Sequence, residues 1–156
     1  MIICDIDGTI ADISHRLHFI QEQPKDWDSF FAECIHDRPI IPVIEAVKRL
    51  SRGSDLYFLT GRPESCRQDT VEWIRQQGFY IPGIWFGDQF YKDLIMRRTG
   101  DHRPDTRVKP ELLLSYLSTL GKDESSVDLI LEDRSSMVKV WRDMGFLCFQ
   151  VASGDY

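Results

Sequence analysis

The chain has 156 residues, of which 42% are hydrophobic and 28% charged, as in an ordinary globular protein with one buried core. The formal net charge of −6 argues against a protein that coats nucleic acid through bulk electrostatics, although local contact with one nucleic-acid end stays possible. No apolar run approaches the roughly 20 residues that a membrane helix needs, and the first residues predict no signal peptide. The four scattered cysteines form no Cys-x-x-Cys pair, so we expect reduced thiols and a cytoplasmic protein.

Five short apolar segments predict the strands of a sheet, with helical periodicity between them. Three of the four helical segments begin near a proline, and a glycine follows each of the four, as is usual for helices. The expected strands are residues 2–4, 54–60, 93–97, 127–131 and 146–151, and the expected helices are residues 42–52, 63–77, 110–120 and 135–144.

This alternation predicts an α/β fold with an open parallel sheet and helices on both faces. Sheets of this kind place their sites outside the carboxyl ends of the strands. Residues 10–41 interrupt the alternation with aromatic and charged side chains, so we expect a small helical insertion over the site. No repeat or linker is evident, which predicts a single domain over residues 1–156.

The segment Asp5-Ile6-Asp7-Gly8-Thr9 follows the first expected strand directly. Its two carboxylates can approach one centre if the chain turns, and Gly8 permits that turn. One acid can then attack phosphorus while the other handles the proton of the leaving group. An aspartate pair that caps a helix or lines a turn is the alternative.

Two later positions provide groups that bind phosphate. Thr60-Gly61-Arg62 ends the second expected strand, where a hydroxyl, free backbone N–H groups and a guanidinium can hold a phosphate. Lys109 lies at the expected start of a helix, where the helix dipole disfavours a cation, so a nearby anion would explain it. Taken alone, a threonine cap and surface basic residues would explain the same pattern.

Glu132 and Asp133 end the fourth expected strand. Together with Asp5 and Asp7 they would collect several carboxylates at one edge of the sheet. Their mutual repulsion calls for a cation, and ligation by oxygen alone favours Mg²⁺ over zinc. A helix cap at Asp133 beside a surface glutamate is the alternative.

These residues resemble the motifs of the haloacid dehalogenase superfamily of phosphotransferases, across nearly the whole chain. The four motifs are matched by Asp5-x-Asp7-Gly8-Thr9, Thr60, Lys109 and Glu132-Asp133. The resemblance implies a Rossmann-like fold of that superfamily, with Asp5 as nucleophile and Asp7 as general acid and then general base. It also implies that Thr60 and Lys109 bind the phosphate.

The same resemblance implies a Mg²⁺ site. Asp5, the main-chain carbonyl of Asp7 and Asp133 would hold the ion, and Glu132 would lie behind them.

A closer resemblance is to the 3′-phosphatase domain of bacteriophage polynucleotide kinase–phosphatases, which repair broken RNA and DNA ends. It is carried by residues 149–156, by residues 141–145, and by Gly100-Asp101 ahead of Asp105 and Lys109. It implies RNA or DNA 3′-phosphate ends as substrate, and the host cytoplasm as location if a phage encodes the chain. The further substrate-binding candidates are Thr9, Arg16, Gly61, Arg62, Arg97 and Asp105.

The residues themselves give modest support for a polynucleotide substrate. Residues 97–109 form a basic segment on an acidic protein, and the aromatic residues just before it could stack a base, or simply pack in the core. Those aromatic residues are Trp85, Phe86, Phe90 and Tyr91.

Other functions fit the same motifs. The chain has no Gly-x-x-x-x-Gly-Lys-Ser/Thr loop, so we expect no 5′-kinase activity in this polypeptide. A phosphatase of small molecules or mononucleotides is the enzymatic alternative. A phospho-acceptor switch or an end-binding module is the non-enzymatic one, although Asp7 occupies a position that phospho-acceptor switches leave without an acid.

Overall fold

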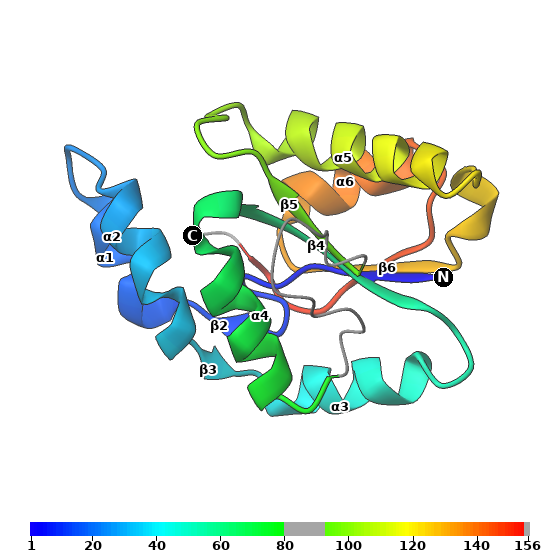
Figure 1. Ribbon diagram of the computed structural model, residues 1–156, viewed down its shortest axis with the longest axis horizontal. Helices are drawn as coiled ribbons and strands as arrows, with labels where there is room; N and C mark the ends of the chain where they lie inside the picture. Colours follow the sequence, from blue (N-terminus) through cyan, green and yellow to red (C-terminus); the bar gives the residue numbers. More distant parts are fainter. Residues whose placement is uncertain (80–92, 155–156) are drawn as a thin grey trace.

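A five-stranded parallel sheet forms the centre of the molecule (Figure 1). The computed structural model describes residues 1–79 and 93–154. The strands lie in the order β5-β4-β1-β6-β7, and their bounds are β1 Ile2–Cys4, β4 Leu56–Pro63, β5 Leu94–Arg97, β6 Leu129–Glu132 and β7 Cys148–Gln150. The predicted α/β fold with an open parallel sheet is confirmed.

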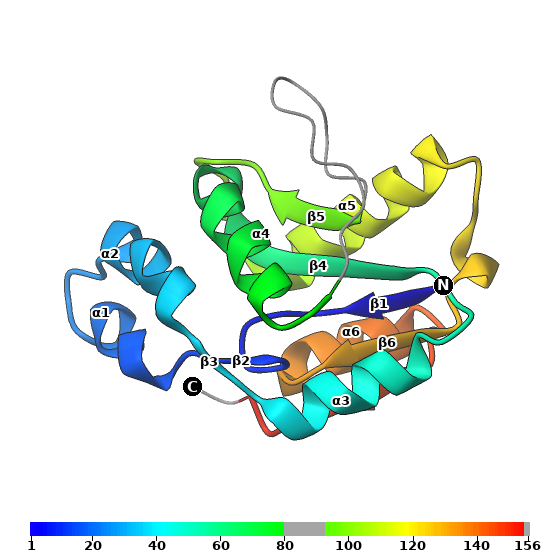
Figure 2. The same cartoon turned by 60° about the horizontal axis from the view of Figure 1, so that its bottom comes forward.

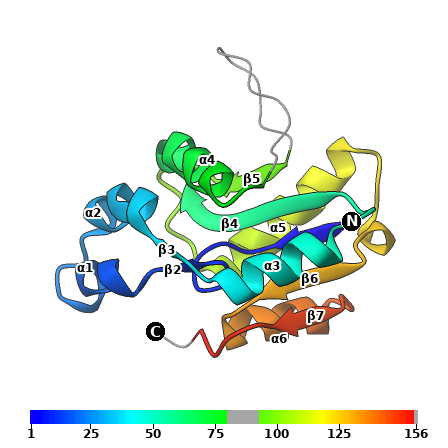
Figure 3. The same ribbon diagram turned by 90° about the horizontal axis from the view of Figure 1, so that it is seen from below.

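Helices cover both faces of this sheet (Figures 1 and 3). One face carries α3, Ile41–Leu50, and α4, Arg67–Gln76, whereas the other carries α5, Asp105–Thr119, and α6, Ser135–Asp143. None of the helices in the described residues is long and apolar enough to cross a membrane.

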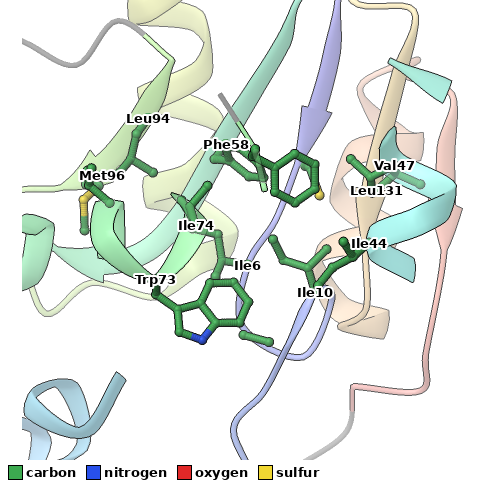
Figure 4. Close-up of a cluster of buried hydrophobic side chains, with 14 of the residues drawn as sticks. Ile6, Ile10, Ile44, Val47, Phe58, Trp73, Ile74, Leu94, Met96 and Leu131 are labelled. Carbon is green, nitrogen blue, oxygen red and sulfur yellow. The ribbon is translucent and has the colours of Figure 1, made fainter. Parts of the chain in front are cut away.

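Alternate residues of the strands point into two separate cores, because successive side chains of a strand face opposite ways. Ile2, Cys4, Phe58 and Leu131 pack with the helices α3 and α4 (Figure 4). Their sequence neighbours, such as Ile3 and Ile130, pack with α5 and α6. Burial on both faces leaves the ends of the strands as the places where polar groups can gather.

The predicted insertion is helical and extends beyond the carboxyl ends of the strands (Figure 2). Two short antiparallel strands, β2 Ala11–Asp12 and β3 Arg38–Pro39, form its stem, a feature that the sequence patterns did not predict. Between them lie α1, His18–Gln21, and α2, Trp27–Ala32, with two 3₁₀ turns, Ser14–Arg16 and Glu33–His36.

Two helix boundaries differ from the prediction. α4 begins at Arg67 and not at Pro63, because β4 continues past Gly61 with a bulge between Thr60 and Pro63. α5 begins at Asp105, so Pro110 lies inside the helix and Lys109 is not at its amino terminus. The argument from the helix dipole for Lys109 was therefore wrong, and contacts of its side chain explain its position instead.

Candidate active site

A buried group of acids with one ammonium forms at the ends of β1 and β6. We call Asp5, Thr9, Lys109, Glu132 and Asp133 the nucleophile cluster. The ammonium of Lys109 lies 2.8 Å from Asp5 Oδ1 and donates a 3.0 Å hydrogen bond to Glu132 Oε2. The hydroxyl of Thr9 lies 3.3 Å from Asp5 Oδ2 and 3.2 Å from Asp133 Oδ1, so it bridges the two acids.

A tight turn after β1 builds this arrangement. The carbonyl of Ile6 accepts backbone N–H groups from Thr9, Ile10 and Ala11, at 3.2, 3.0 and 2.9 Å. Gly8 has a φ of 81°, a conformation that side chains other than hydrogen disfavour. The turn brings Thr9 back against Asp5, which explains why both belong to one motif.

Burial and mutual repulsion shift the ionisation of this cluster. Burial and the neighbouring Glu132 carboxylate raise the pKa of Asp5 to about 8, although Lys109 opposes the shift. Burial and Asp5 raise the pKa of Asp133 to about 6. The pKa of Lys109 lies well above its ordinary value, since Asp5 and Glu132 outweigh the effect of burial. With its three acids ionised, the cluster would carry more negative charge than its one ammonium balances, and the raised pKa values reflect this excess.

The cluster fits a hard divalent cation. Oxygen atoms of Asp5, Glu132 and Asp133 all lie within 4.8 Å of one another. Asp133 Oδ2 and Glu132 Oε1 are buried and have no hydrogen-bond partner among the residues that the structure describes. Buried carboxylate oxygens of this kind are costly unless paired, and an all-oxygen set suits Mg²⁺.

The carboxyl-terminal segment closes over Asp133. Gly154 lies so near that a Cβ atom added there would come within 2.4 Å of Asp133 Oδ2. Its φ of 45° also favours glycine. A glycine at this place is required for the segment to pack on the acid.

A second group, the arginine cluster, consists of Asp7, Arg16, Asp37 and Arg62. Asp7 Oδ1 accepts hydrogen bonds from Arg16 Nη2 at 2.7 Å and from Arg62 Nε and Nη2 at 2.9 and 2.6 Å. Both guanidiniums are fully buried. Burial alone would raise the pKa of Asp7, but Arg62 and Arg16 hold it well below its usual range.

Asp37 completes this cluster and was missed at the sequence level. It accepts 2.7 Å hydrogen bonds from Arg16 Nε and Nη2 and a 2.6 Å bond from Arg62 Nη2. Its own carbonyl accepts from Trp73 Nε1 at 2.7 Å. Asp37 belongs to the insertion and Arg62 to β4, so this carboxylate ties the insertion to the sheet. A single acid outside any motif gave no signal in the sequence.

A third set of contacts lies where β5 meets the start of α5. Asp105 accepts from Arg97 through Oδ1 and from Arg134 Nη1 through Oδ2, the latter at 3.1 Å. A Cβ atom added at Gly61 would lie 2.7 Å from Asp105 Oδ1, so the backbone of β4 passes directly beside this acid. Arg134 was also missed, although it directly follows the acidic pair at 132–133.

Two arginines of the basic segment predicted at residues 97–109 are engaged in contacts close to their own position. Arg97 Nη1 donates to the carbonyls of Asp101 and Arg103 at 2.9 and 2.8 Å, which fixes the loop before α5. Arg103 pairs with Asp101 and Glu111. The aromatic residues Trp85, Phe86, Phe90 and Tyr91 lie outside the described residues.

Thr60 is fully buried at the bulge of β4. Its hydroxyl oxygen accepts a 3.2 Å hydrogen bond from the backbone N–H of Arg62. Bulges beside active sites commonly redirect a side chain, and this one directs Arg62 toward Asp7. The sequence predicted that this strand ends at Thr60, whereas the structure continues it through the bulge to Pro63.

Part of each group lines one cleft of about 570 Å³. Its lining includes acids of both clusters, the segment 99–105 and, from the insertion, Trp27, Phe30 and Phe31. The acids predicted at separate strand ends therefore converge, as the parallel topology requires.

Fold and cleft together define a phosphatase of the haloacid dehalogenase type. A hydrolase of the haloacid dehalogenase-like family from Streptococcus pneumoniae has the same fold, with a TM-score of 0.62, 17% identity and coverage of 96% of this chain and 82% of that chain. The family model for the polynucleotide kinase PNKP phosphatase domain matches residues 1–156. The chain belongs to this family.

Two relatives are longer than this chain. A protein of Autographa californica nuclear polyhedrosis virus that carries the name bifunctional polynucleotide kinase/RNA ligase is 29% identical over 145 residues, which are 92% of this chain and 18% of that protein. A chain in the solved Pnkp1/Rnl/Hen1 RNA repair complex is 28% identical, with a TM-score of 0.72 and coverage of 99% and 43%. The chain thus spans less than half the length of either relative.

Proposed function

We propose that this chain is a Mg²⁺-dependent polynucleotide 3′-phosphatase that works through an aspartyl phosphate on Asp5. The observation that carries the proposal is the nucleophile cluster, in which a buried carboxylate contacts an ammonium beside two further acids. A carboxylate held in this way can attack a phosphoryl group while nearby positive charge stabilises the oxygens.

In the first step, the Asp5 carboxylate attacks phosphorus in line with the bond to the ribose. A new bond forms between Asp5 and phosphorus, the bond to the 3′-oxygen breaks, and that oxygen takes a proton from Asp7. Lys109 and Thr60 would bind the phosphoryl oxygens, which is the main contribution of a protein to phosphoryl transfer.

In the second step, water attacks the phosphorus of the aspartyl phosphate. Asp7 takes a proton from this water, the Asp5 carboxylate is restored and inorganic phosphate leaves. The low pKa of Asp7 keeps this carboxylate ionised, which is the form that can accept the proton, but it also makes Asp7 a weak base while Arg16 and Arg62 hold it. For the first step Asp7 must be protonated, and a negatively charged end that draws on Arg16 and Arg62 would favour that form.

Asp5, Asp133 and the main-chain carbonyl of Asp7 would hold the Mg²⁺, with Glu132 behind them. The ion supplies positive charge that keeps the carboxylates ionised and offsets the charge of the phosphoryl group. The unpartnered oxygen of Asp133 is the observation on this chain that supports a cation there.

A polynucleotide end is the substrate that we propose. It is supported by membership of the polynucleotide kinase PNKP phosphatase family and by the relative found in an RNA repair complex. The nucleotide end would be bound by Arg16, Arg62, Arg97 and Asp105. The phosphate itself would be contacted by Thr9 and Gly61.

A phosphate-release assay tests the function. Oligonucleotides with 3′-phosphate, 5′-phosphate or 2′,3′-cyclic phosphate ends and free 3′-mononucleotides are compared with and without Mg²⁺. We expect release from the 3′-phosphate oligonucleotide, only with Mg²⁺. A strong preference for free nucleotides would overturn the substrate assignment.

Asp5→Asn tests the covalent route in the same assay. We expect a loss of about 10³-fold or more in rate, since removal of a nucleophile eliminates the chemical step. Asp143→Asn is the matched control, because Asp143 forms an exposed pair with Lys139 on α6. Near-normal release by Asp5→Asn, with circular dichroism unchanged, would exclude the aspartyl phosphate.

A further inference from the structure

One wall of the cleft is aromatic and belongs to the insertion. Trp27 on α2 is 41% exposed although it lines the cleft. Its ring lies nearly parallel to that of Phe31, with centroids 5.8 Å apart and 22° between the planes. Phe30 meets it edge to face at 5.7 Å. The indole is therefore held in place by its neighbours while much of its surface stays open.

This wall connects directly to the arginine cluster. The ring of Phe30 lies 4.2 Å from the guanidinium carbon of Arg16. Arg16 Nη2 in turn donates to Asp7 at 2.7 Å. Phe30 and Arg16 thus link Trp27 to the acid that handles the proton, and Trp27, Asp5 and Asp7 line the same cleft.

We propose that Trp27 is a stacking platform for the base of the terminal nucleotide at a 3′-phosphate end. The inference rests on the proposed function, because it places the nucleoside next to the phosphate that Asp5 attacks. In such an end the base is joined to the same ribose that carries the scissile phosphate. A flat apolar surface in the same cleft suits a base, whereas a sugar phosphate or other aliphatic phosphate would gain little from it.

Charge near the ring fits a polynucleotide as well. The ammonium of Lys25 lies 5.6 Å from the centroid of the Trp27 ring. Lys25 is exposed and has a flexible side chain, so a base can displace it from the ring face. The displaced ammonium would remain near the ring as a positive charge for a phosphodiester of the same strand. Stacking accepts every base, so the platform would recognise a nucleoside without selecting its sequence.

Two substrates test the role of the base. One is a 3′-phosphorylated oligonucleotide, and the other is the same oligonucleotide with an abasic terminal residue that carries the 3′-phosphate. For the wild-type protein we expect kcat/KM to be about tenfold higher with the base present, a factor typical of one stacked base. A wild-type protein that hydrolyses both equally would overturn the inference.

Variants locate the effect at Trp27. We expect Trp27→Ala to bring the ratio of the two kcat/KM values close to one and Trp27→Phe to keep most of it, since phenylalanine still offers a ring. Leu147→Ala is the control, because Leu147 is 57% exposed and precedes β7 at the amino end of the sheet. It should keep the wild-type ratio.

The measurements distinguish a failure of the Trp27 platform from a failure of the 3′-phosphatase activity on which it rests. Release of phosphate by the wild-type protein, together with an unchanged ratio in Trp27→Ala, contradicts the platform and leaves the 3′-phosphatase intact. No release from either substrate by the wild-type protein contradicts the proposed function and the platform with it.

Discussion

The nucleophile cluster and the arginine cluster both contribute acids to one cleft, but their charge balance differs. In the arginine cluster two carboxylates face two guanidiniums, and Asp7 and Asp37 each contact both. In the nucleophile cluster three carboxylates face the single ammonium of Lys109, and oxygens of Glu132 and Asp133 lack partners among the described residues.

The charge balance of each cluster indicates what that cluster is suited to do. A balanced, fully hydrogen-bonded group of buried charges holds its members in fixed positions, and here it joins the insertion to the sheet. A group with excess negative charge gains most by binding something positive. The first is therefore expected to behave as a structural unit that controls Asp7, and the second as a binding site.

Removal of one charge from the balanced cluster should give the largest loss of stability. We expect Asp37→Asn to lower the free energy of unfolding by about 3–5 kcal/mol, because it leaves two buried guanidiniums with one counter-charge. Urea unfolding measures it. Asp143→Asn, which breaks an exposed pair, should cost about 0–1 kcal/mol. Equal effects for the two variants would show that the cluster is not a structural unit.

Cation binding should stabilise only the unbalanced cluster. Saturating Mg²⁺ at about 100 times its Kd should add about 2.7 kcal/mol to the wild-type protein relative to a chelator. Asp133→Asn should lose most of this gain, whereas Asp101→Asn should keep it, because Asp101 lines the same cleft but is paired with Arg103. Thermal unfolding gives the result without reference to activity, and a full gain in Asp133→Asn would contradict the site.

The two clusters should also respond to pH in opposite directions. The pKa values of Asp5 and Asp133 are raised to about 8 and about 6, so the folded protein keeps protons that the unfolded chain releases above about pH 4. In chelator the free energy of unfolding should therefore fall as pH rises from about 5 to about 8. Mg²⁺ should flatten this slope, because bound carboxylates stay ionised.

Asp7 behaves in the opposite way. Because the folded protein lowers the pKa of Asp7, this ionised carboxylate stabilises the fold at every pH above the ordinary aspartate pKa of about 3.9. That stability is lost only when the pH falls to the lowered pKa of Asp7 in the folded protein. Urea midpoints at a series of pH values separate the two effects. A stability that rises between about pH 5 and about pH 8 in chelator would contradict the description of the nucleophile cluster.

The sequence brought the acids of the nucleophile cluster together because they lie at the ends of strands of a parallel sheet. Strand ends meet at one edge whatever the details of the loops, so Asp5 and Asp133 had to come close. Lys109 was placed correctly for a wrong reason, since its helix starts at Asp105 and the ammonium is held by Asp5 and Glu132.

The arginine cluster was predictable only in part. Arg16 was found through family resemblance and Arg62 from its position after the second expected strand, but the contact of both with Asp7 was not predicted. Asp37 belongs to no motif, and its partners lie 21 and 25 residues away in opposite directions along the chain. Periodicity describes neighbours within one element, so it gives no information about a carboxylate whose role depends on two distant guanidiniums.

The smallest expected effect concerns Gly61, where the backbone of β4 passes Asp105 between the two clusters. In Gly61→Ala the new methyl group would lie 2.7 Å from Asp105 Oδ1, and Arg134 helps to hold that acid in place. Gly53→Ala is the control, since Gly53 has a φ of 84° but open space around it. Both variants should lose about 1–2 kcal/mol of stability, through a clash in Gly61→Ala and a strained φ in Gly53→Ala.

Only Gly61→Ala should also lower kcat/KM for the 3′-phosphate oligonucleotide, by about tenfold, because small displacements in an active site are costly to the rate. Equal activity in the two variants would show that Asp105 and its arginines support the fold and not the site.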